Sequence, residues 1–414
     1  MRKLLVAAVL FFAPAAFSGT CPPDEPLLKV DGRTVNYSYF EFVESRLPKW
    51  ALRRFYSGLS GREKLLEKIG QRQLILTYYE KRGYFNDPVV KRRLEKFKID
   101  ELISMLVNKR LSEVKVSPEE VEKALEKYPP KERARLRKFV EINIKAHKFE
   151  DAERKLYSGA MRGVKIVNLH PEKEGDVVAV YPGGKVTYGE LQPLLNGSSS
   201  AEALKRAVRD YMLYLKAKAQ GLDRTEKFKN ELLYYKESLA VKAFESEIAS
   251  QVKVSDDEVK RYYREHKQEF RTPERAKVTV YPFESEEAAK EALQKLKKGI
   301  PPAKAIPKEV FSRGRVVEVE EGQNNPVAQL VFTEKGKKLY LLNVPSGKTL
   351  LVVLDRFVPS RVLGYGDVYT TIKNRLKVEK ERRLVKRKLE ELKKEFGVKA
   401  LRGALVCLGS EKSD

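Results

Sequence analysis

The feature that most constrains the fold of this chain is an internal repeat. The first copy opens at residues 28–37 with LKVDGRTVNY, and the second opens at residues 178–188 with VAVYPGGKVTY. Each opening places apolar residues on both sides of a glycine turn, which is typical of two short strands. A helix start follows in both copies, with Asn36 and Thr187 as its cap residues. The sequence therefore predicts two copies of one module.

Both copies also end on nearly the same sequence. Residues 114–121 read VKVSPEEV, and residues 252–259 read VKVSDDEV. In each, a serine is followed three residues later by glutamate, the capping-box pattern that begins a helix. Apolar residues recur at helical spacing before these caps, and a glycine, Gly83 or Gly221, interrupts each helical stretch. One such module alone would expose an apolar face, so the copies are expected to pack on each other or on the C-terminal helix.

The other segments differ in character. Residues 129–175 contain a strand-like run at 139–144, and they are interpreted either as a plain connecting subdomain or as a remnant of the domain that follows the second copy. Residues 271–358 combine strand patterns with an amphipathic helix at 286–297, which predicts a small α+β domain. Residues 367–396 read as one long charged helix.

The predicted fold is mainly α and multidomain, with a duplicated helical module, a small α+β domain and a long C-terminal helix. The expected parts, in chain order, are a signal segment at 1–18, a first helical module at 27–128, a connecting subdomain at 129–175, a second helical module at 176–270, the α+β domain at 271–358, a C-terminal helix at 359–397 that packs back on the modules, and a tail at 398–414.

The N-terminus has the layout of a secretory signal. Arg2 and Lys3 precede an apolar run over residues 4–12, and small residues follow near 16–18. The apolar run is too short to span a bilayer. We therefore expect the mature protein in the periplasm or cell envelope; the alternative is a cytoplasmic protein that begins with a buried helix.

The charge of the chain limits the classes of partner that it can bind. The formal net charge is +25, which is compatible with a nucleic-acid binder. However, the basic residues are spread along helices and mixed with glutamate, and no zinc spacing or aromatic RNA-binding run accompanies them. Attraction to an anionic membrane surface or to acidic unfolded chains fits this pattern better. We expect no nucleic-acid partner.

Two cysteines, Cys21 and Cys407, stand near the two ends of the mature chain. In an oxidising compartment they could form a disulfide that ties the termini together. They could also be free thiols, or Cys21 could carry a lipid, although Ser18-Gly19-Thr20 fits a lipoprotein signal poorly. All three outcomes stay open at this point.

Residues for metal or cofactor chemistry are scarce. The three histidines, His147, His170 and His266, lack metal-ligand spacing. The sequence has no phosphate-binding loop and no dinucleotide fingerprint. We interpret the histidines as surface or packing residues and expect neither a metal nor a cofactor.

The junction after the second copy resembles that of a known group. Residues 254–259 (VSDDEV), 262–263 (YY) and 266–270 (HKQEF), followed by Pro273, look like the entry into the parvulin-type (PpiC) domain of the SurA, PrsA and PpiD envelope foldases. The repeat opening and the C-terminal helix resemble those of the same group. The resemblance implies a chaperone that holds unfolded secreted or outer-membrane proteins without ATP, and in many members a domain that isomerises bonds before proline.

The sequence departs from that group where catalysis is expected. In this alignment Thr279 and Thr349 stand at the two positions that usually hold histidine, and Gly314 alone is left of a glycine-rich stretch. Phe332 alone is left of the apolar platform. Rotation about a prolyl bond has to cross a barrier of roughly 18–20 kcal/mol. We therefore expect weak or absent isomerase activity and assign no catalytic residue.

Tyrosine pairs are candidates for binding client chains. Tyr234 and Tyr235, together with Phe332, are the residues assigned to peptide binding, because aromatic rings with a polar tip suit varied extended chains. The alternative is that the tyrosines pack between helices. Two other functions are kept beside the chaperone: an active isomerase that uses groups other than histidine, and a structural scaffold for one envelope partner.

Overall fold

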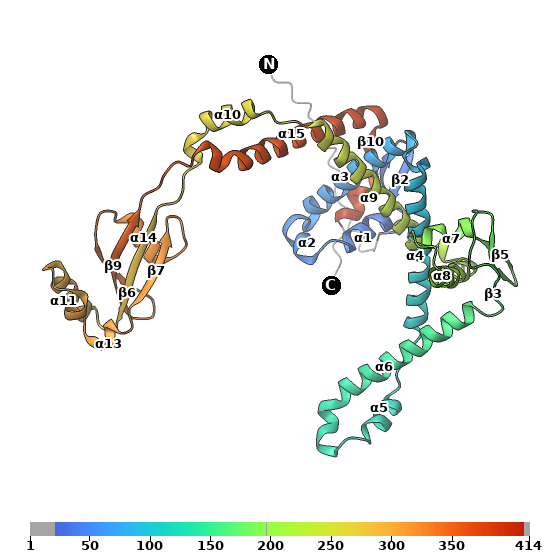
Figure 1. Ribbon diagram of the computed structural model, residues 1–414, viewed down its shortest axis with the longest axis horizontal. Helices are drawn as coiled ribbons and strands as arrows, with labels where there is room; N and C mark the ends of the chain where they lie inside the picture. The colour runs from blue at the N-terminus through green and yellow to red at the C-terminus, as the bar shows by residue number, and fades with distance from the viewer. Residues whose placement is uncertain (1–20, 196, 410–414) are drawn as a thin grey trace. The chain divides into compact units, whose positions relative to one another are not determined.

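The computed structural model describes residues 21–195 and 197–409, and the predicted signal segment lies outside the described residues. The described residues form two compact units, one made of the residues up to 250 together with those from 384 onward, and the other of residues 251–383 (Figure 1). Helices dominate, and the sheets are small and antiparallel, so the predicted mainly α fold with an α+β part is confirmed. Among the described residues, no helix has the length and apolarity that a membrane span requires.

The two repeated segments contain strands and helices in a similar order, and the first has one helix more. The first copy consists of β1 (Pro26–Val30), β2 (Arg33–Asn36), α1 (Tyr37–Ser45), α2 (Lys49–Phe55), α3 (Gly58–Lys81), η1 (Tyr84–Asn86), α4 (Pro88–Ser112) and α5 (Pro118–Leu125), and α6 (Pro130–Ala160) follows it. The second consists of β4 (Val177–Tyr181), β5 (Gly184–Thr187), α7 (Tyr188–Leu195), α8 (Ala201–Ala219), η2 (Leu222–Arg224), α9 (Glu226–Gln251) and α10 (Asp256–Glu265), and β3 (Lys165–Ile166) precedes it.

The repeated sequence signals produce matching local structure. Gly83 and Gly221 both adopt the left-handed conformation, with φ of 72° and 71°, which glycine reaches at little cost. Ser117 and Ser255 each form a complete capping box at the start of α5 and α10. The glycine breaks and capping boxes expected within each repeated segment are thus present as helix ends and helix starts.

The two copies exchange their second long helices. In one core, Phe244 and Ile248 of α9 pack with Ile69 of α3, so the second copy contributes a helix to the first. In another core, Leu102 of α4 packs with Leu213 of α8, so the first copy contributes a helix to the second. Each repeated segment therefore shares part of its core with the other.

The last residues of the described chain belong to the first copy's core. β10 (Val398–Ala400) pairs with β1 in the sheet order β10-β1-β2, just as β3 pairs with β4 in the order β3-β4-β5. α16 (Arg402–Gly409) buries Ala404, Cys407 and Leu408. The prediction of a tail at 398–414 is wrong for these residues, because their apolar spacing of three and four places one helix face in the core.

The strand predicted at 139–144 is also wrong, since these residues lie inside α6. β-branched and aromatic residues favour a strand locally. Over a longer window Leu136, Val140 and Ile144 recur every four residues, and this helical stripe packs on Val121 of α5. Residues 130–160 form one helix. The strand on which the interpretation of a remnant α+β domain depended is therefore not present in these residues.

The hairpin of α5 and α6 instead has a counterpart in α10 and α15 (Tyr365–Phe396). Lys148 donates to the Lys115 carbonyl at 2.9 Å and to Glu120 of the capping box at 2.6 Å. Lys380 contacts the Lys253 carbonyl at 2.7 Å and Glu258 at 2.6 Å. The lysine follows its carbonyl partner by 33 residues in the first hairpin and by 127 in the second. The α+β domain is thus an insertion between two helices that a short turn, 126–129, joins in the first copy.

The inserted domain is a four-stranded antiparallel sheet with the order β7-β6-β9-β8. Its strands are β6 (Arg275–Phe283), β7 (Arg315–Glu320), β8 (Leu339–Asn343) and β9 (Thr349–Val358), and the short helix η3 (Lys267–Glu269) precedes them. One face packs on α11 (Glu286–Lys297), α12 (Pro302–Ala305) and α13 (Lys308–Phe311), and the other packs on α14 (Pro326–Thr333).

Candidate functional site

Thr279 and Thr349 lie on neighbouring strands of the inserted domain but do not meet. Thr279 of β6 stands opposite Val353 of β9, and Thr349 stands opposite Phe283. The two threonines are thus four residues apart along the paired strands, about 13 Å at the usual rise per residue. Two groups at this separation cannot act on one peptide bond, nor can they hydrogen-bond to each other as a facing pair.

Each threonine hydroxyl already has its own partner. The Thr279 hydroxyl lies 2.7 Å from Asp355, and the Thr349 hydroxyl lies 2.7 Å from the side-chain oxygen of Asn343. Thr349 is buried. These contacts tie β6 to β9 and β8 to β9, which is a structural role within the sheet.

Phe332 lies on the other side of the sheet from the two threonines. It lies on α14 and packs against a cluster of aliphatic and aromatic side chains. The sheet residues of this cluster include Val278, Val280 and Val352. Side chains alternate between faces along a strand, so Val278 and Val280 flank Thr279 but point the other way. The hydroxyl of Tyr340, the polar group of this cluster, donates to the Lys337 carbonyl at 2.7 Å. The sheet face that packs against Phe332 therefore presents valines, and not the two threonines that the alignment assigns to the histidine positions.

Gly314 is needed for packing on the threonine side. A side chain there would clash with the ring of Tyr281, which stacks on Phe311 at 5.8 Å. The last glycine of the reduced stretch therefore lets a loop pass beneath an aromatic ring.

A comparison with protein families identifies the inserted domain. Residues 254–368 match the family model described as the PPIC-type PPIase domain. The chain carries a PPIC-type PPIase domain. The match begins at the second capping segment and ends in the first turn of α15, so it covers the domain and both helical borders of the insertion. No curated protein matches the chain.

Solved structures of SurA-like chaperones and of the foldase PrsA show limited similarity. One comes from the work on PEB4 and the periplasmic protein Cj1289, two SurA-like chaperones of Campylobacter jejuni, with a TM-score of 0.37, 18% identity, and coverage of 53% of this chain and 98% of that one. The foldase PrsA of Lactococcus lactis has a TM-score of 0.24 and 12% identity, and the match covers 92% of this chain and 97% of that one. PrsA of Bacillus subtilis has a TM-score of 0.17 and 17% identity, with coverage of 54% of this chain and 93% of that one.

The predicted peptide-binding tyrosines are occupied by contacts within the helical unit. Tyr234 packs its ring edge-to-face on Phe42, with the ring centroids 5.9 Å apart, and Arg72 lies 4.8 Å above it. Tyr235 stacks on Phe97 at 4.0 Å. Both rings therefore hold α9 against helices of the first copy, as the packing interpretation of the tyrosine pairs expects.

A buried charge pair joins α9 to α3. Glu237 of α9 is fully buried, with Arg72 Nε 2.6 Å from one carboxylate oxygen and the Gln73 amide donating to the other. Burial raises the pKa of Glu237, and the positive charge of Arg72 acts in the opposite direction. The pair fixes the exchange of α9 onto α3.

An exposed aromatic surface lies on α2 and the start of α3. Trp50, Phe55 and Leu59 are 64%, 50% and 49% exposed. The Trp50 and Phe55 rings meet edge-to-face at 6.2 Å, and Phe55 contacts the ring of Tyr56 at 6.4 Å. We call these four residues the α2 patch. It presents large apolar groups to solvent, which folded proteins mostly do at binding sites.

The α2 patch is exposed because α2 is short. In its seven residues only Ala51 is buried, so one contact point anchors the helix and leaves its rings outside. Basic side chains surround the rings: Arg54 lies 5.4 Å above Phe55 and Lys68 lies 6.0 Å from Tyr56. The sequence contains one signal for this patch that the predictions above did not include: the chain's one tryptophan, Trp50, stands beside Lys49 and close to Arg53.

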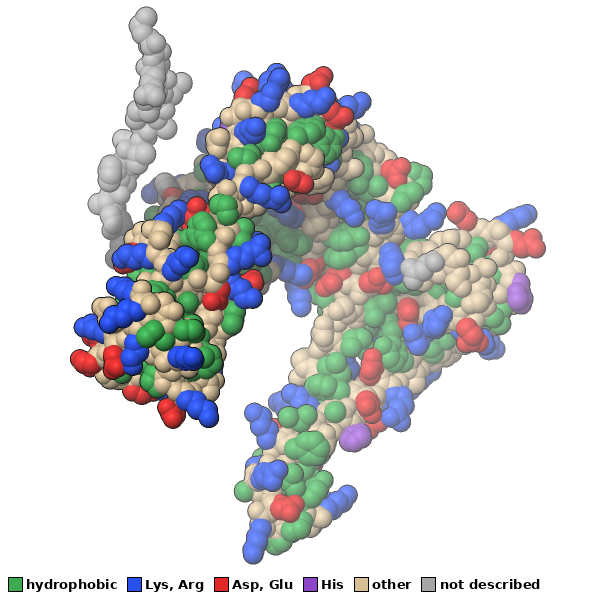
Figure 2. Space-filling model, turned by 60° about the vertical axis from the view of Figure 1, so that its left-hand side comes forward, with side chains coloured by type: hydrophobic (Ala, Val, Ile, Leu, Met, Phe, Trp, Pro, Cys, Tyr) green, Lys and Arg blue, Asp and Glu red, His purple; other side chains and the backbone are tan. Residues whose placement is uncertain are grey.

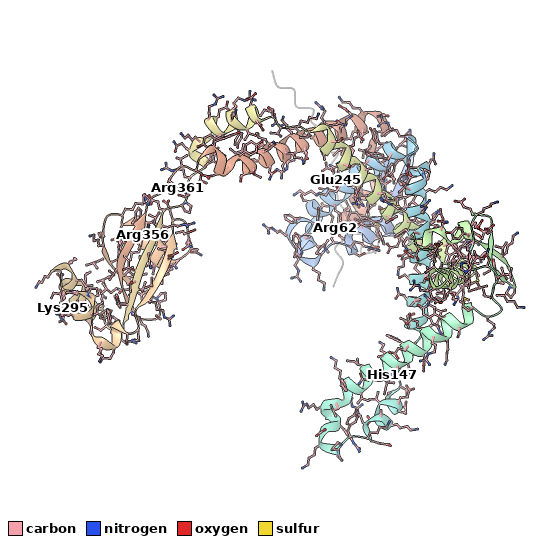
Figure 3. All side chains as sticks on the ribbon, in the orientation of Figure 1. Arg62, His147, Glu245, Lys295, Arg356 and Arg361 are labelled. Carbon is pink, nitrogen blue, oxygen red and sulfur yellow. A yellow bond between two sulfur atoms is a disulfide. The ribbon has the colours of Figure 1, made fainter. Side chains whose placement is uncertain are left out.

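A second apolar surface lies where α3, β10 and α16 meet. A cleft of about 520 Å³ is lined by the apolar residues Leu28, Leu66, Val398, Ala400, Ala404 and Leu408 and by Glu63, Glu67 and Lys393. Arg62, labelled in Figure 3, donates from α3 to the Cys407 and Leu408 carbonyls at 3.2 and 3.1 Å. These bonds satisfy carbonyls at the end of α16 and hold this wall of the cleft.

The structure joins Cys21 and Cys407 in a disulfide, with the two Cα atoms 5.4 Å apart. The bond links the start of the described chain to α16, beside the residues that line the cleft. Among the described residues no cluster of acidic, histidine or cysteine side chains has the arrangement of a metal site. His266 stacks on Tyr262 at 4.1 Å, a packing contact.

Proposed function

We propose that this protein is an ATP-independent chaperone of the cell envelope that holds unfolded exported proteins, and that its PPIC-type domain does not catalyse prolyl isomerisation. The observation that carries the proposal is the α2 patch. It presents Trp50, Phe55 and Leu59 to solvent among basic side chains, in the helical unit and outside the PPIC-type domain.

The chemistry of the patch suits weak binding of many sequences. Aromatic and aliphatic side chains gain free energy when they bury apolar area, roughly 25 cal/mol per Å² and without a directional requirement. No nucleotide is needed for such binding and release. The net charge of +25 speeds the encounter with acidic chains, because opposite charges steer association.

The geometry of the PPIC-type domain supports the second part of the proposal. Lowering the barrier to prolyl rotation needs polar groups that converge on a twisted amide. Here Thr279 and Thr349 are four residues apart along paired strands, and the face beneath Phe332 is built from valines and other apolar residues. Neither face of the sheet offers a converging pair at the positions that the family alignment assigns.

An exported location is part of the same proposal. Disulfides persist in oxidising compartments and are rare in the cytosol of most organisms. The pairing of Cys21 with Cys407 supports export, and it leaves no thiol at Cys21 for a lipid. An intact-mass measurement of mature protein tests this; a fatty-acylated Cys21 would contradict it.

The function is tested with a protein whose refolding is limited by one prolyl isomerisation. Adding mature protein in increasing amounts should slow refolding in proportion to the amount added, and replacing Trp50 and Phe55 with serine should remove most of the slowing. Acceleration at substoichiometric amounts would establish an active isomerase instead. An unchanged rate, together with capture of one stoichiometric partner from envelope extracts, would favour the scaffold.

A further inference from the structure

The hairpin of α5 and α6 and the hairpin of α10 and α15 share one inner surface. Counterparts in α6 and α15 differ by a constant 232 in residue number, as shown by Lys148 and Lys380, which make equivalent contacts. By this correspondence Val140 matches Ile372, and both are buried against the shorter helix. The inner residues of both hairpins are therefore of the same kind.

The outer surface of α6 differs from that of its counterpart. An exposed stripe runs along α6, which we call the α6 stripe: Lys131, Arg135, Lys138, Phe139, Ile142 and Lys145. Phe139 and Ile142 are 56% and 57% exposed. The central four residues of the stripe are those at 135, 138, 139 and 142. The exposed positions that match them in α15 are Asp367, Thr370, Thr371 and Asn374. The stripe is therefore not required for forming such a hairpin.

The stripe is basic and apolar without acidic interruption. With 100° per residue, Glu132 and Glu141 lie about a quarter of a turn from its middle. Figure 2 shows hydrophobic and basic side chains side by side over the end of this hairpin, and Figure 3 places His147 further along the same helix. A helix with Lys and Arg beside exposed Phe and Ile has the composition of helices that lie on anionic membranes.

From these observations we propose that the α6 stripe docks the protein on an anionic membrane surface, with Phe139 and Ile142 entering the headgroup region and the lysines and arginine contacting lipid phosphates. A membrane fits better than an acidic peptide, because the stripe covers the outer, convex side of a two-helix hairpin. A flat surface can contact the whole stripe at once, whereas bound peptides usually lie in concave grooves.

The counterpart helix supplies variants that leave the hairpin intact. F139T/I142N and R135D/K138T introduce the residues that α15 carries at these positions, and they do not touch the inner residues or Lys148. Binding of mature wild-type protein is measured by flotation with vesicles of phosphatidylcholine alone or mixed with phosphatidylglycerol. Wild-type protein should partition to the anionic vesicles, and far less to the neutral ones.

The first variant should lower the partition coefficient at least about tenfold, since it removes two apolar groups. The second should lower it by roughly a hundredfold, because three units of charge are lost and each is worth about fivefold near an anionic surface. R382D/K386T on α15 makes the same charge change at exposed positions and should alter binding by less than about threefold.

Three results would overturn the proposal. One is F139T/I142N binding vesicles as tightly as wild type while its circular dichroism is unchanged. A second is an equal loss of vesicle binding in R135D/K138T and R382D/K386T, because binding would then depend on the overall charge and not on the α6 stripe. If the stripe variants lose binding to an acidic peptide but not to vesicles, the occupant is an acidic chain and the membrane assignment is wrong.

Discussion

The exchange of α9 onto α3 can be tested at its buried charge pair. Replacing Arg72 with methionine keeps an apolar side chain against the Tyr234 ring, which Arg72 now covers at 4.8 Å. It removes the cation 2.6 Å from Glu237 and leaves a fully buried carboxylate whose remaining partners, the Gln73 amide and the Tyr39 hydroxyl, are neutral. A neutral amide cannot offset the desolvation of a full charge.

The expected cost is about 3–5 kcal/mol at neutral pH, the usual range when one partner of a buried ion pair is removed. The cost should depend on pH in a definite direction. Burial already raises the folded-state pKa of Glu237, and Arg72 opposes that rise, so R72M raises it further. A raised folded-state pKa favours folding at low pH, and this stability is lost as pH increases above the ordinary pKa of glutamate.

Urea unfolding followed by circular dichroism, at about pH 5 and about pH 7, measures both quantities. R72M should lose less stability at the lower pH, where the raised pKa of Glu237 favours its uncharged form, than at the higher. The double variant R72M/E237Q is the control, because it carries no charge at this site and should show no such dependence. An equal loss at both pH values in R72M, or the same pH dependence in the double variant, would refute the reasoning.

Three further predictions concern other parts of the chain. Replacing Trp50 and Phe55 with serine should weaken holding of unfolded chains in an aggregation assay and leave the melting temperature nearly unchanged, because both are at least half exposed; a large drop in melting temperature would show a structural role instead. Gly61→Ala should destabilise the helical unit by about 1–3 kcal/mol in urea unfolding, since its new methyl group would clash with the Tyr56 backbone; unaltered stability would mean that α2 shifts freely. Thr349→Val should cost about 1 kcal/mol through its lost hydrogen bond to Asn343 and should not change the rate of proline-limited refolding; a changed rate would point to catalysis.

Part of the candidate site could be anticipated from sequence and part could not. The PPIC-type domain was located by its entry segment, and the isomerase positions were assigned by alignment alone. The alignment could not show that Thr279 and Phe332 lie on opposite sides of the sheet. An assignment shifted by one residue changes the face of a strand, and strand register is set by pairing between distant segments.

The sequence by itself determined the local features of this protein. The repeated caps, the two left-handed glycines and the periodic apolar residues specify helix starts and breaks through interactions within a few residues. From these features the sequence predicts two similar modules. Only the tertiary structure decided which surface each helix buries: α4 and α9 cross to the other copy, Tyr234 and Tyr235 become packing residues, and residues 139–144 continue a helix. Burial depends on partners far away in the chain, and a local pattern does not name them. For the same reason the exposed α2 patch and the α6 stripe became visible only once every other apolar face had been covered.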